Sequence, residues 1–157
     1  MTPPSLLTTP NRWLAALGSS FQSLLLLVIR FYWGWQFFLT GKGKLADLSR
    51  PTQFFASLRI PAPHLNAVVV STTECVGGLL LLLGLGSRFI TPIFIFEMII
   101  AYATSEREAL HAIFSHPDKF LGADPFLFLF ASVIVFVFGP GRFALDSLVF
   151  KSSASAK

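Results

Sequence analysis

Four long apolar runs constrain this chain more than any other feature of its sequence. Crossing the hydrocarbon core of a bilayer as a helix takes about 20 residues, with a range of roughly 17–25. The first two runs are long enough, and the last two reach that length when their flanks, residues 88–105 and 120–138, are included. We therefore predict an all-α fold, a bundle of four transmembrane helices with short interfacial helices in the loops. The runs are residues 21–39, 67–85, 89–103 and 125–138.

The composition excludes most classes of soluble protein. Charged residues make up only 13% of the chain, whereas a soluble domain carries about 25%. The 12 basic and 8 acidic residues leave a net charge of +4, but the basic residues are scattered and form no nucleic-acid motif, so nucleic acid is excluded as a partner. The single cysteine, Cys75, rules out an intramolecular disulfide and any cysteine-rich metal site.

The chain divides into three parts by hydropathy and polarity. Residues 1–20 are predicted to form an N-terminal interfacial segment, residues 21–147 the four-helix membrane domain and residues 148–157 a flexible polar tail. In the first long loop, Pro51 and the apolar residues that follow it predict a short interfacial helix. A surface helix is also expected in the second long loop, residues 105–124.

The distribution of charge gives an expected orientation. An even number of spans places both termini on the same side of the membrane. Arg88 and Arg142 stand directly at predicted helix ends, and five acidic residues lie in the two larger loops on the opposite side. Basic residues at helix ends are typical of the cytoplasmic side, so we expect both termini to be cytoplasmic.

Three ionisable residues fall inside the predicted spans, namely Arg30, Glu74 and Glu97. Each costs about 2.5–3.5 kcal/mol at the centre of a membrane helix. Counting the helical rise from the end of each run places all three at a similar depth, and we expect Arg30 to pair with Glu74. Two interpretations stay open. The charges form a structural pair that sets helix register, or they line a polar pocket for a quinone, a proton or a substrate head group.

Glu97 bears on the choice between a structural pair and a polar pocket, because no second cation lies inside the spans to neutralise it. It must be protonated, share Arg30, or meet water or a ligand. A protonatable carboxyl group beside an Arg–Glu pair suits quinone reduction or proton-coupled binding. The alternative is a neutral Glu97 that is hydrogen-bonded to a neighbouring helix or turned towards lipid.

Three more side chains are candidates for such a pocket: Trp33, Gln36 and Lys44. Trp33 and Gln36 lie beyond Arg30 on the first span, and Lys44 follows the span, where it could point back over the mouth of the bundle. The alternative for Trp33 is an interfacial aromatic belt, and the alternative for Lys44 is a snorkelling surface side chain.

Small residues in the second span are candidates for helix packing. Gly77 and Gly78 follow Cys75, and small residues let membrane helices approach closely. We expect Cys75 to be inert, because no group that would stabilise a thiolate is placed beside it apart from Arg30. His111 and His116 are too poorly spaced, with too few other ligands, to hold a metal, so no metal site is expected.

Several motifs together carry a resemblance to a known family. The chain resembles the DoxX family of small four-helix bacterial and archaeal membrane proteins. The resemblance covers about residues 25–147, with the motifs in order. They are Arg30 in the first span, Gly41-Lys42-Gly43-Lys44-Leu45, the stretch from Phe54 to Pro63, Glu74-Cys75-Val76-Gly77-Gly78-Leu79 running to Gly84, Arg88, and Gly139-Pro140-Gly141-Arg142-Phe143-Ala144-Leu145-Asp146.

The resemblance implies a multi-pass protein of the bacterial or archaeal inner membrane. It implies a membrane subunit of a quinone- or thiol-linked redox assembly with a partner protein in the complex. The cofactor is left unassigned, with a quinone as the candidate. By position, Arg30, Lys44, Glu74 and Arg142 are the family-like polar residues, and Arg142 is assigned a structural role. No catalytic residue is assigned. The chain departs from the pattern at Ala144, where a serine is expected.

The missing cysteine pair argues against autonomous redox catalysis, so the chain is at most the membrane subunit of a quinone-linked oxidoreductase. The alternative is a non-catalytic interaction subunit that docks onto a larger membrane complex. A transporter is a weaker alternative, because four helices without a repeat make a poor alternating-access machine as a monomer.

Overall fold

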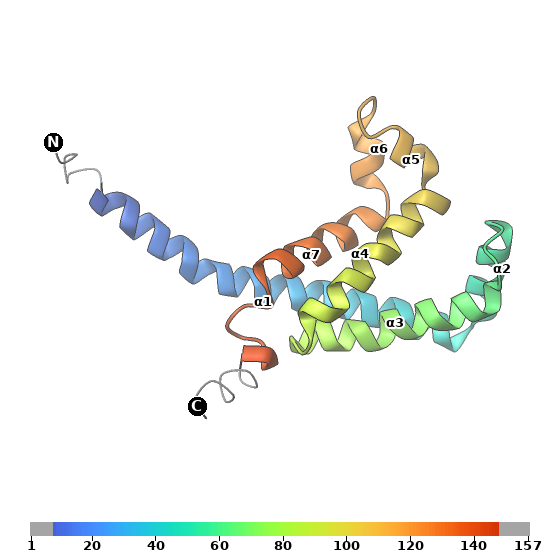
Figure 1. Ribbon diagram of the computed structural model, residues 1–157, viewed down its shortest axis with the longest axis horizontal. Helices are drawn as coiled ribbons and strands as arrows, with labels where there is room; N and C mark the ends of the chain where they lie inside the picture. The colour runs from blue at the N-terminus through green and yellow to red at the C-terminus, as the bar shows by residue number, and fades with distance from the viewer. Residues whose placement is uncertain (1–7, 148–157) are drawn as a thin grey trace.

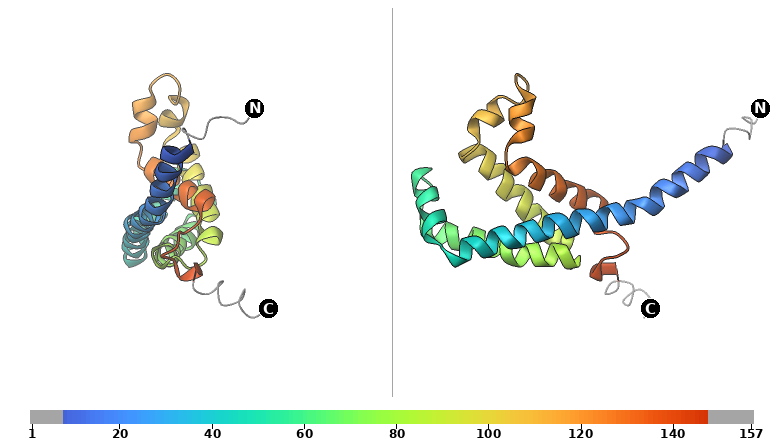
Figure 2. Two further views of the ribbon diagram at one scale, coloured as in Figure 1. Left: turned by 90° about the vertical axis from the view of Figure 1, so that its left-hand side faces the viewer. Right: turned by 180° about the vertical axis from the view of Figure 1, so that it is seen from behind.

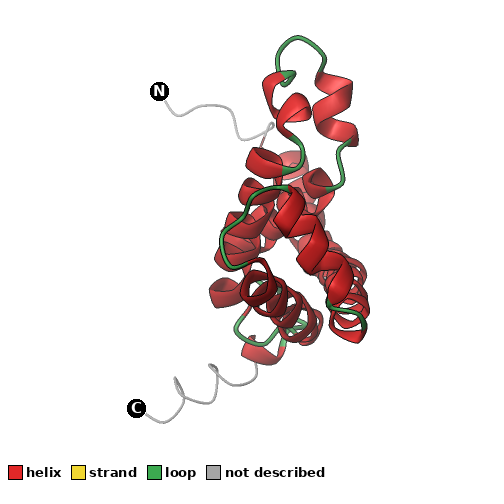
Figure 3. Ribbon diagram, turned by 90° about the vertical axis from the view of Figure 1, so that its right-hand side faces the viewer, coloured by secondary structure: helices red, strands yellow, loops and turns green. Residues whose placement is uncertain are grey.

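The computed structural model describes residues 8–147, and within that range the chain folds into helices without a strand (Figures 1 and 3). The predicted polar tail, residues 148–157, and the first seven residues of the predicted N-terminal segment lie outside the described residues. The helical class is confirmed. The helices are α1 (Thr8–Ala46), α2 (Ser49–Ser57), α3 (Pro63–Leu83), α4 (Ser87–Thr104), α5 (Arg107–His111), α6 (Pro117–Gly122) and α7 (Pro125–Phe138).

Three of these helices, α1, α3 and α4, are long and apolar enough to cross a membrane. The fourth predicted span corresponds to α7, which is apolar but has only 14 residues. Helix α1 is longer than predicted, with 39 residues and a length of about 58 Å. It begins at Thr8 and continues without a break into the first apolar run.

The long helices are arranged as two packed pairs. Helix α1 lies along α3, and α4 lies along α7. Helices α3 and α4 are joined by a tight turn, in which Gly84 and Gly86 have φ angles of 70° and 60°, values that favour glycine. From this turn the two pairs diverge, whereas the N-terminal half of α1 extends beyond the other helices (Figures 1 and 2).

Glycines set the close approach of α1 to α3. A Cβ atom added at Gly34 would lie 2.7 Å from the backbone nitrogen of Leu82, and one at Gly78 would meet the backbone of Phe38. Gly77 faces α4 instead, where an added Cβ would lie 2.7 Å from side-chain atoms of Ile90. The glycines that the sequence marks for packing therefore lie at two different helix contacts.

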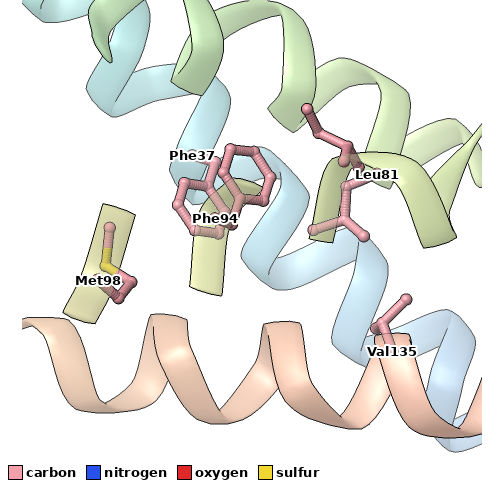
Figure 4. Packing of buried hydrophobic residues seen from close by; sticks show 6 residues of the cluster. Phe37, Leu81, Phe94, Met98 and Val135 are labelled. Atoms are coloured by element: carbon pink, nitrogen blue, oxygen red, sulfur yellow. The ribbon is translucent and has the colours of Figure 1, made fainter. Parts of the chain in front are cut away.

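A small aromatic and aliphatic core joins the two pairs near the turn. The rings of Phe37 from α1 and Phe94 from α4 are stacked, with centroids 3.8 Å apart (Figure 4). Because core side chains come from all four long helices, the pairs are held together at this end. The buried cluster is Phe37, Leu81, Ile90, Phe94, Met98 and Val135.

The two long loops contain short helices, as the sequence predicts. The first loop forms α2, with Pro51 buried in its first turn. The second loop forms two helices, α5 and α6, where one was expected. The hydroxyl of Tyr102 in α4 donates a hydrogen bond of 2.7 Å to the carbonyl of Phe120 in α6, which fastens this loop to the end of α4.

Candidate functional site

A cavity of about 740 Å³ lies between the two helix pairs, on the side where they diverge. Its walls come from α1, α2, α3, α4 and α7 and are mostly apolar. Small-molecule sites in proteins usually measure about 300–1,000 Å³, so the volume suits a ligand of modest size. The aromatic side chains of the wall are Phe37, Phe54, Phe55, Phe96 and Phe128.

An ion pair forms part of this cavity wall. The Nζ atom of Lys44 lies 2.6 Å from Oε1 of Glu74. The side chain of Glu74 is 5% exposed and that of Lys44 is 32% exposed. Lys44 is in the last turn of α1, and Gly41, one turn earlier, lets this end of α1 contact the backbone of α3 at Cys75. The close crossing therefore brings the ammonium group to the buried carboxylate.

Glu97 supplies a second carboxyl group from α4. It lines the same cavity as Glu74 and Lys44 and lies within hydrogen-bond reach of the carboxyl group of Glu74. The α3–α4 turn explains the meeting, since Glu74 lies nine residues before the end of α3 and Glu97 ten residues after the start of α4. Two buried oxygens of the pair, Oε2 of Glu74 and Oε1 of Glu97, have no hydrogen-bond partner among the described residues.

The predicted pair of Arg30 and Glu74 is wrong. Arg30 is fully buried, and its Nη2 atom donates a hydrogen bond of 3.0 Å to the carbonyl oxygen of Phe143. Its guanidinium packs on Gly84. Arg30 therefore binds the segment after α7 to the α3–α4 turn.

The physical reason for the error is the register of α1. Residue 21 begins the apolar run, but the helix itself begins at Thr8, so the start of the run does not mark the same level as the ends of the other helices. Along α1, Arg30 and Lys44 are separated by 14 residues, which is about 21 Å. Since Lys44 is the cation at Glu74, Arg30 lies at the other end of the bundle.

The segment after α7 is held by a second set of contacts. The carboxylate of Asp146 accepts hydrogen bonds of 2.8 Å from the backbone N–H of Gly86 and 3.2 Å from that of Ser87. These N–H groups lie at the N-terminus of α4, where a negative charge is favourable. Arg142 is exposed nearby, and Ala144, which replaces the expected serine, is buried.

The remaining predicted pocket residues do not line the cavity. Trp33 and Gln36 are half-buried, and Trp33 contacts Phe128 edge-on with ring centroids 4.9 Å apart. Of the six pocket candidates, only Lys44, Glu74 and Glu97 are brought together in the cavity wall. Among the described residues there is no group of three or more His, Cys, Asp or Glu side chains that could hold a metal ion.

Sequence reasoning missed the contribution of the loops to the site. Phe54 and Phe55 of α2 line the cavity, and so do the polar residues Asn66, Glu106 and Asp124. The apolar residues of α2 are the available signal, but the same pattern is typical of a helix that lies on the membrane surface. Which loop residues reach the cavity depends on how the helix pairs diverge, and a linear pattern does not contain that information.

Comparisons with known proteins place this arrangement in context. A family model described as DoxX matches residues 25–107, a range that includes Lys44, Glu74 and Glu97. A Bacillus subtilis (strain 168) protein named "Putative oxidoreductase CatD" is 31% identical to the chain over 127 residues. This alignment covers 80% of the chain and 87% of the relative. No solved structure matches the chain.

Proposed function

The chain belongs to the DoxX family of membrane proteins, and on that premise we propose that it is the membrane subunit of a redox assembly whose cavity binds a quinone. The observation that carries this proposal is the Lys44–Glu74 ion pair, with Glu97 beside it, in the wall of an apolar cavity between membrane helices. Charged side chains are costly to insert into a membrane, so a cluster of them inside membrane helices supports a functional site.

The cavity walls fit the chemistry of a quinone. Aromatic side chains provide flat apolar surfaces for the ring, and the ammonium group of Lys44 is a hydrogen-bond donor for a ring carbonyl. The carboxyl groups of Glu74 and Glu97 can hold or release a proton at the ring oxygens. A bound quinone would supply the two-electron carrier chemistry, and a partner protein would supply the electrons.

Several apolar residues of the cavity wall are exposed, which suits a lipid-soluble ligand. Val69 of α3, together with Ile93, Phe96 and Ile100 of α4, lines the cavity, and these residues are 41–65% exposed. They lie on the two helices that diverge from the Gly84–Gly86 turn. A quinone with an apolar tail could therefore enter from the bilayer and leave its tail in lipid.

A pair of phenylalanine substitutions on α3 tests the proposal. Thr73→Phe places a large side chain in the cavity without removing a charge, so we expect quinone retained by the purified protein to fall at least tenfold. Val76→Phe changes a lipid-exposed position on the same helix and should retain quinone at the wild-type level. The measurement is quinone per protein after solvent extraction and mass spectrometry. Equal retention in both variants would show that the cavity is not the binding site.

The finer membrane topology is part of the proposal. We propose four spans in the inner membrane, with α7 as the short fourth span beside α4 and both termini cytoplasmic. Helix α7 is about 21 Å long from its 14 residues, and a short span is accommodated by local thinning of the bilayer. The loop between α5 and α6 and the segment after α7 lie at opposite ends of α4 and α7 (Figure 1).

Cysteine labelling tests this topology. In a Cys75→Ser background, Arg142→Cys should react with an impermeant maleimide only from the cytoplasmic side, and Ser115→Cys only from the opposite side. Both positions are exposed in the structure. If both cysteines are labelled from the same side, α7 does not span the membrane. If Arg142→Cys is labelled only from the non-cytoplasmic side and Ser115→Cys only from the cytoplasmic side, the proposed orientation is wrong.

One observation favours the second candidate function, a non-catalytic interaction subunit. The N-terminal half of α1 extends past the other helices (Figure 2), and Trp13, Leu14 and Phe21 on it are 65–72% exposed. This apolar surface could dock onto a larger membrane complex. Loss of complex formation on truncating this half, with no quinone in wild-type protein, would favour that function.

A further inference from the structure

The cavity lies between a tightly packed end and a polar end of the helix bundle. The packed end contains the α3–α4 turn, and we call it the turn end. The floor of the cavity on this side is made by Phe37 and Met98, which belong to the buried core (Figure 4). Phe37 stacks on Phe94, and these two residues are 1% and 0% exposed. Close-packed interiors leave few voids for water, so this core separates the cavity from the turn end.

A second buried layer lies beyond the core at the turn end. Arg30 is 0% exposed and donates its hydrogen bond to the carbonyl of Phe143, which belongs to the segment after α7. Seven residues of α1 separate Arg30 from Phe37, a distance of about 10 Å. Water that entered from the turn end would therefore have to cross two buried layers.

Polar residues line the cavity at the opposite end of the bundle. This end carries α2, α5 and α6, and we call it the loop end (Figure 1). Helices α3 and α7 begin at the loop end, and α4 ends there. Because polar side chains bind water and two of these residues, Ser105 and Asp124, are exposed, water can enter the cavity at this end. The polar residues of the loop end that line the cavity are Asn66, Thr104, Ser105, Glu106 and Asp124.

The charged cluster lies between the core and the loop end. Glu97 follows Phe94 by one turn of α4 and precedes Thr104 by seven residues, about 10 Å. Lys44 is in the last turn of α1, and its side chain is 32% exposed. Ionisable side chains inside membrane helices almost always face the bundle interior or a water-filled cavity. The cluster lies where water from the loop end would reach it.

We propose that the cavity is a proton half-channel, in which water reaches the cluster of Lys44, Glu74 and Glu97 from the loop end and not from the turn end. The inference rests on the proposed function and deepens it, because it names the side of the membrane with which a bound quinone exchanges protons. Two-electron reduction of a quinone to a hydroquinone takes up two protons. The partner protein supplies the two electrons, and the half-channel supplies both protons from the loop end.

Cysteine reactivity in sealed membrane vesicles of known orientation tests this access. In the Cys75→Ser background, Thr73→Cys places a thiol in the cavity wall. The probe is a methanethiosulfonate with a quaternary ammonium group, which stays in water and reacts with the thiolate. We expect Thr73→Cys to react from the side that labels Ser115→Cys, and at least tenfold more slowly from the other side. Equal or faster reaction from the other side, or no reaction from either, would overturn the inference.

Val76→Cys is the matched control on the same helix. Val76 is 52% exposed and is not part of the cavity wall, so its thiol faces lipid, where a thiolate is unfavourable. From the loop end it should react at least tenfold more slowly than Thr73→Cys. Equal rates would mean that the reagent reaches α3 outside the cavity, which contradicts the half-channel.

A second pair of variants tests the position of the entrance. Added to Thr73→Cys, Ser105→Trp narrows the polar end of the cavity and should slow modification at least threefold. Ala103→Trp changes an exposed position of α4 outside the cavity wall and should leave the rate unchanged. An unchanged rate with Ser105→Trp would place the entrance for water elsewhere and overturn the inference.

The outcomes separate this inference from the proposed function. If Thr73→Cys reacts from the loop end but the wild-type protein retains no quinone, the water access stands and the quinone function is wrong. If the wild-type protein retains quinone but Thr73→Cys reacts only from the turn end, the quinone function stands and the half-channel is wrong.

Discussion

Replacing Lys44 with methionine is expected to lower the free energy of unfolding by about 3 kcal/mol, the lower end of the range for breaking a buried ion pair. Glu74 is almost fully buried, and Lys44 is the cation 2.6 Å from it. Without that cation the carboxylate stays buried and uncompensated, or it takes up a proton. The lower end applies because about a third of the lysine side chain remains exposed. Denaturation of the purified protein in mild detergent provides the measurement.

A double substitution is the control for this effect. Adding Glu74→Gln to Lys44→Met removes the charge that the first change left unpaired, so the double variant should lose less stability than the sum of the two single variants. Arg50 pairs with Asp47 at 3.3 Å but is 89% exposed, and Arg50→Met should leave stability within error. Strictly additive losses would mean that Lys44 and Glu74 do not interact.

Two glycine substitutions on α1, two residues apart, are expected to have opposite effects. A Cβ atom at Gly41 would meet the backbone of Cys75 and lie 2.7 Å from the carbonyl oxygen of Ser71. Backbone atoms cannot rotate away, so Gly41→Ala should separate α1 from α3 at a cost of about 3 kcal/mol, the upper part of the usual range for overpacking. An added Cβ at Gly43 meets nothing within 4 Å, so Gly43→Ala should stabilise the helix by about 1 kcal/mol.

Unfolding of the two alanine variants under identical conditions provides the measurement. Separation of α1 from α3 would also move Lys44 away from Glu74, so Gly41→Ala should in addition weaken ligand retention, and Gly43→Ala should not. Stabilisation by both substitutions would mean that α1 and α3 do not approach as closely as the structure shows.

Much of the candidate site could be predicted from the sequence because its members are chemically unusual for their location. Glu74 and Glu97 are charged residues in apolar runs, and Lys44 lies five residues after the end of one. The partners could not be predicted in the same way. Arg30 and Glu74 have opposite charges and occupy neighbouring spans, but the structure gives Arg30 the carbonyl of Phe143 and gives Glu74 the ammonium group of Lys44.

The sequence by itself determined the helical class, the position of the apolar helices and the breaks between them. Each of these depends on the hydropathy of one segment and on local residues such as Pro63 and Gly84, so a linear pattern contains the information. Only the tertiary structure decided which charges meet and where a cavity opens. Those features depend on the register of α1 against α3, set by backbone contacts at Gly41 and Gly78, and on the divergence of the two helix pairs from one turn. A sliding of one helix by a single turn of about 5.4 Å would change every pairing while leaving each helix intact.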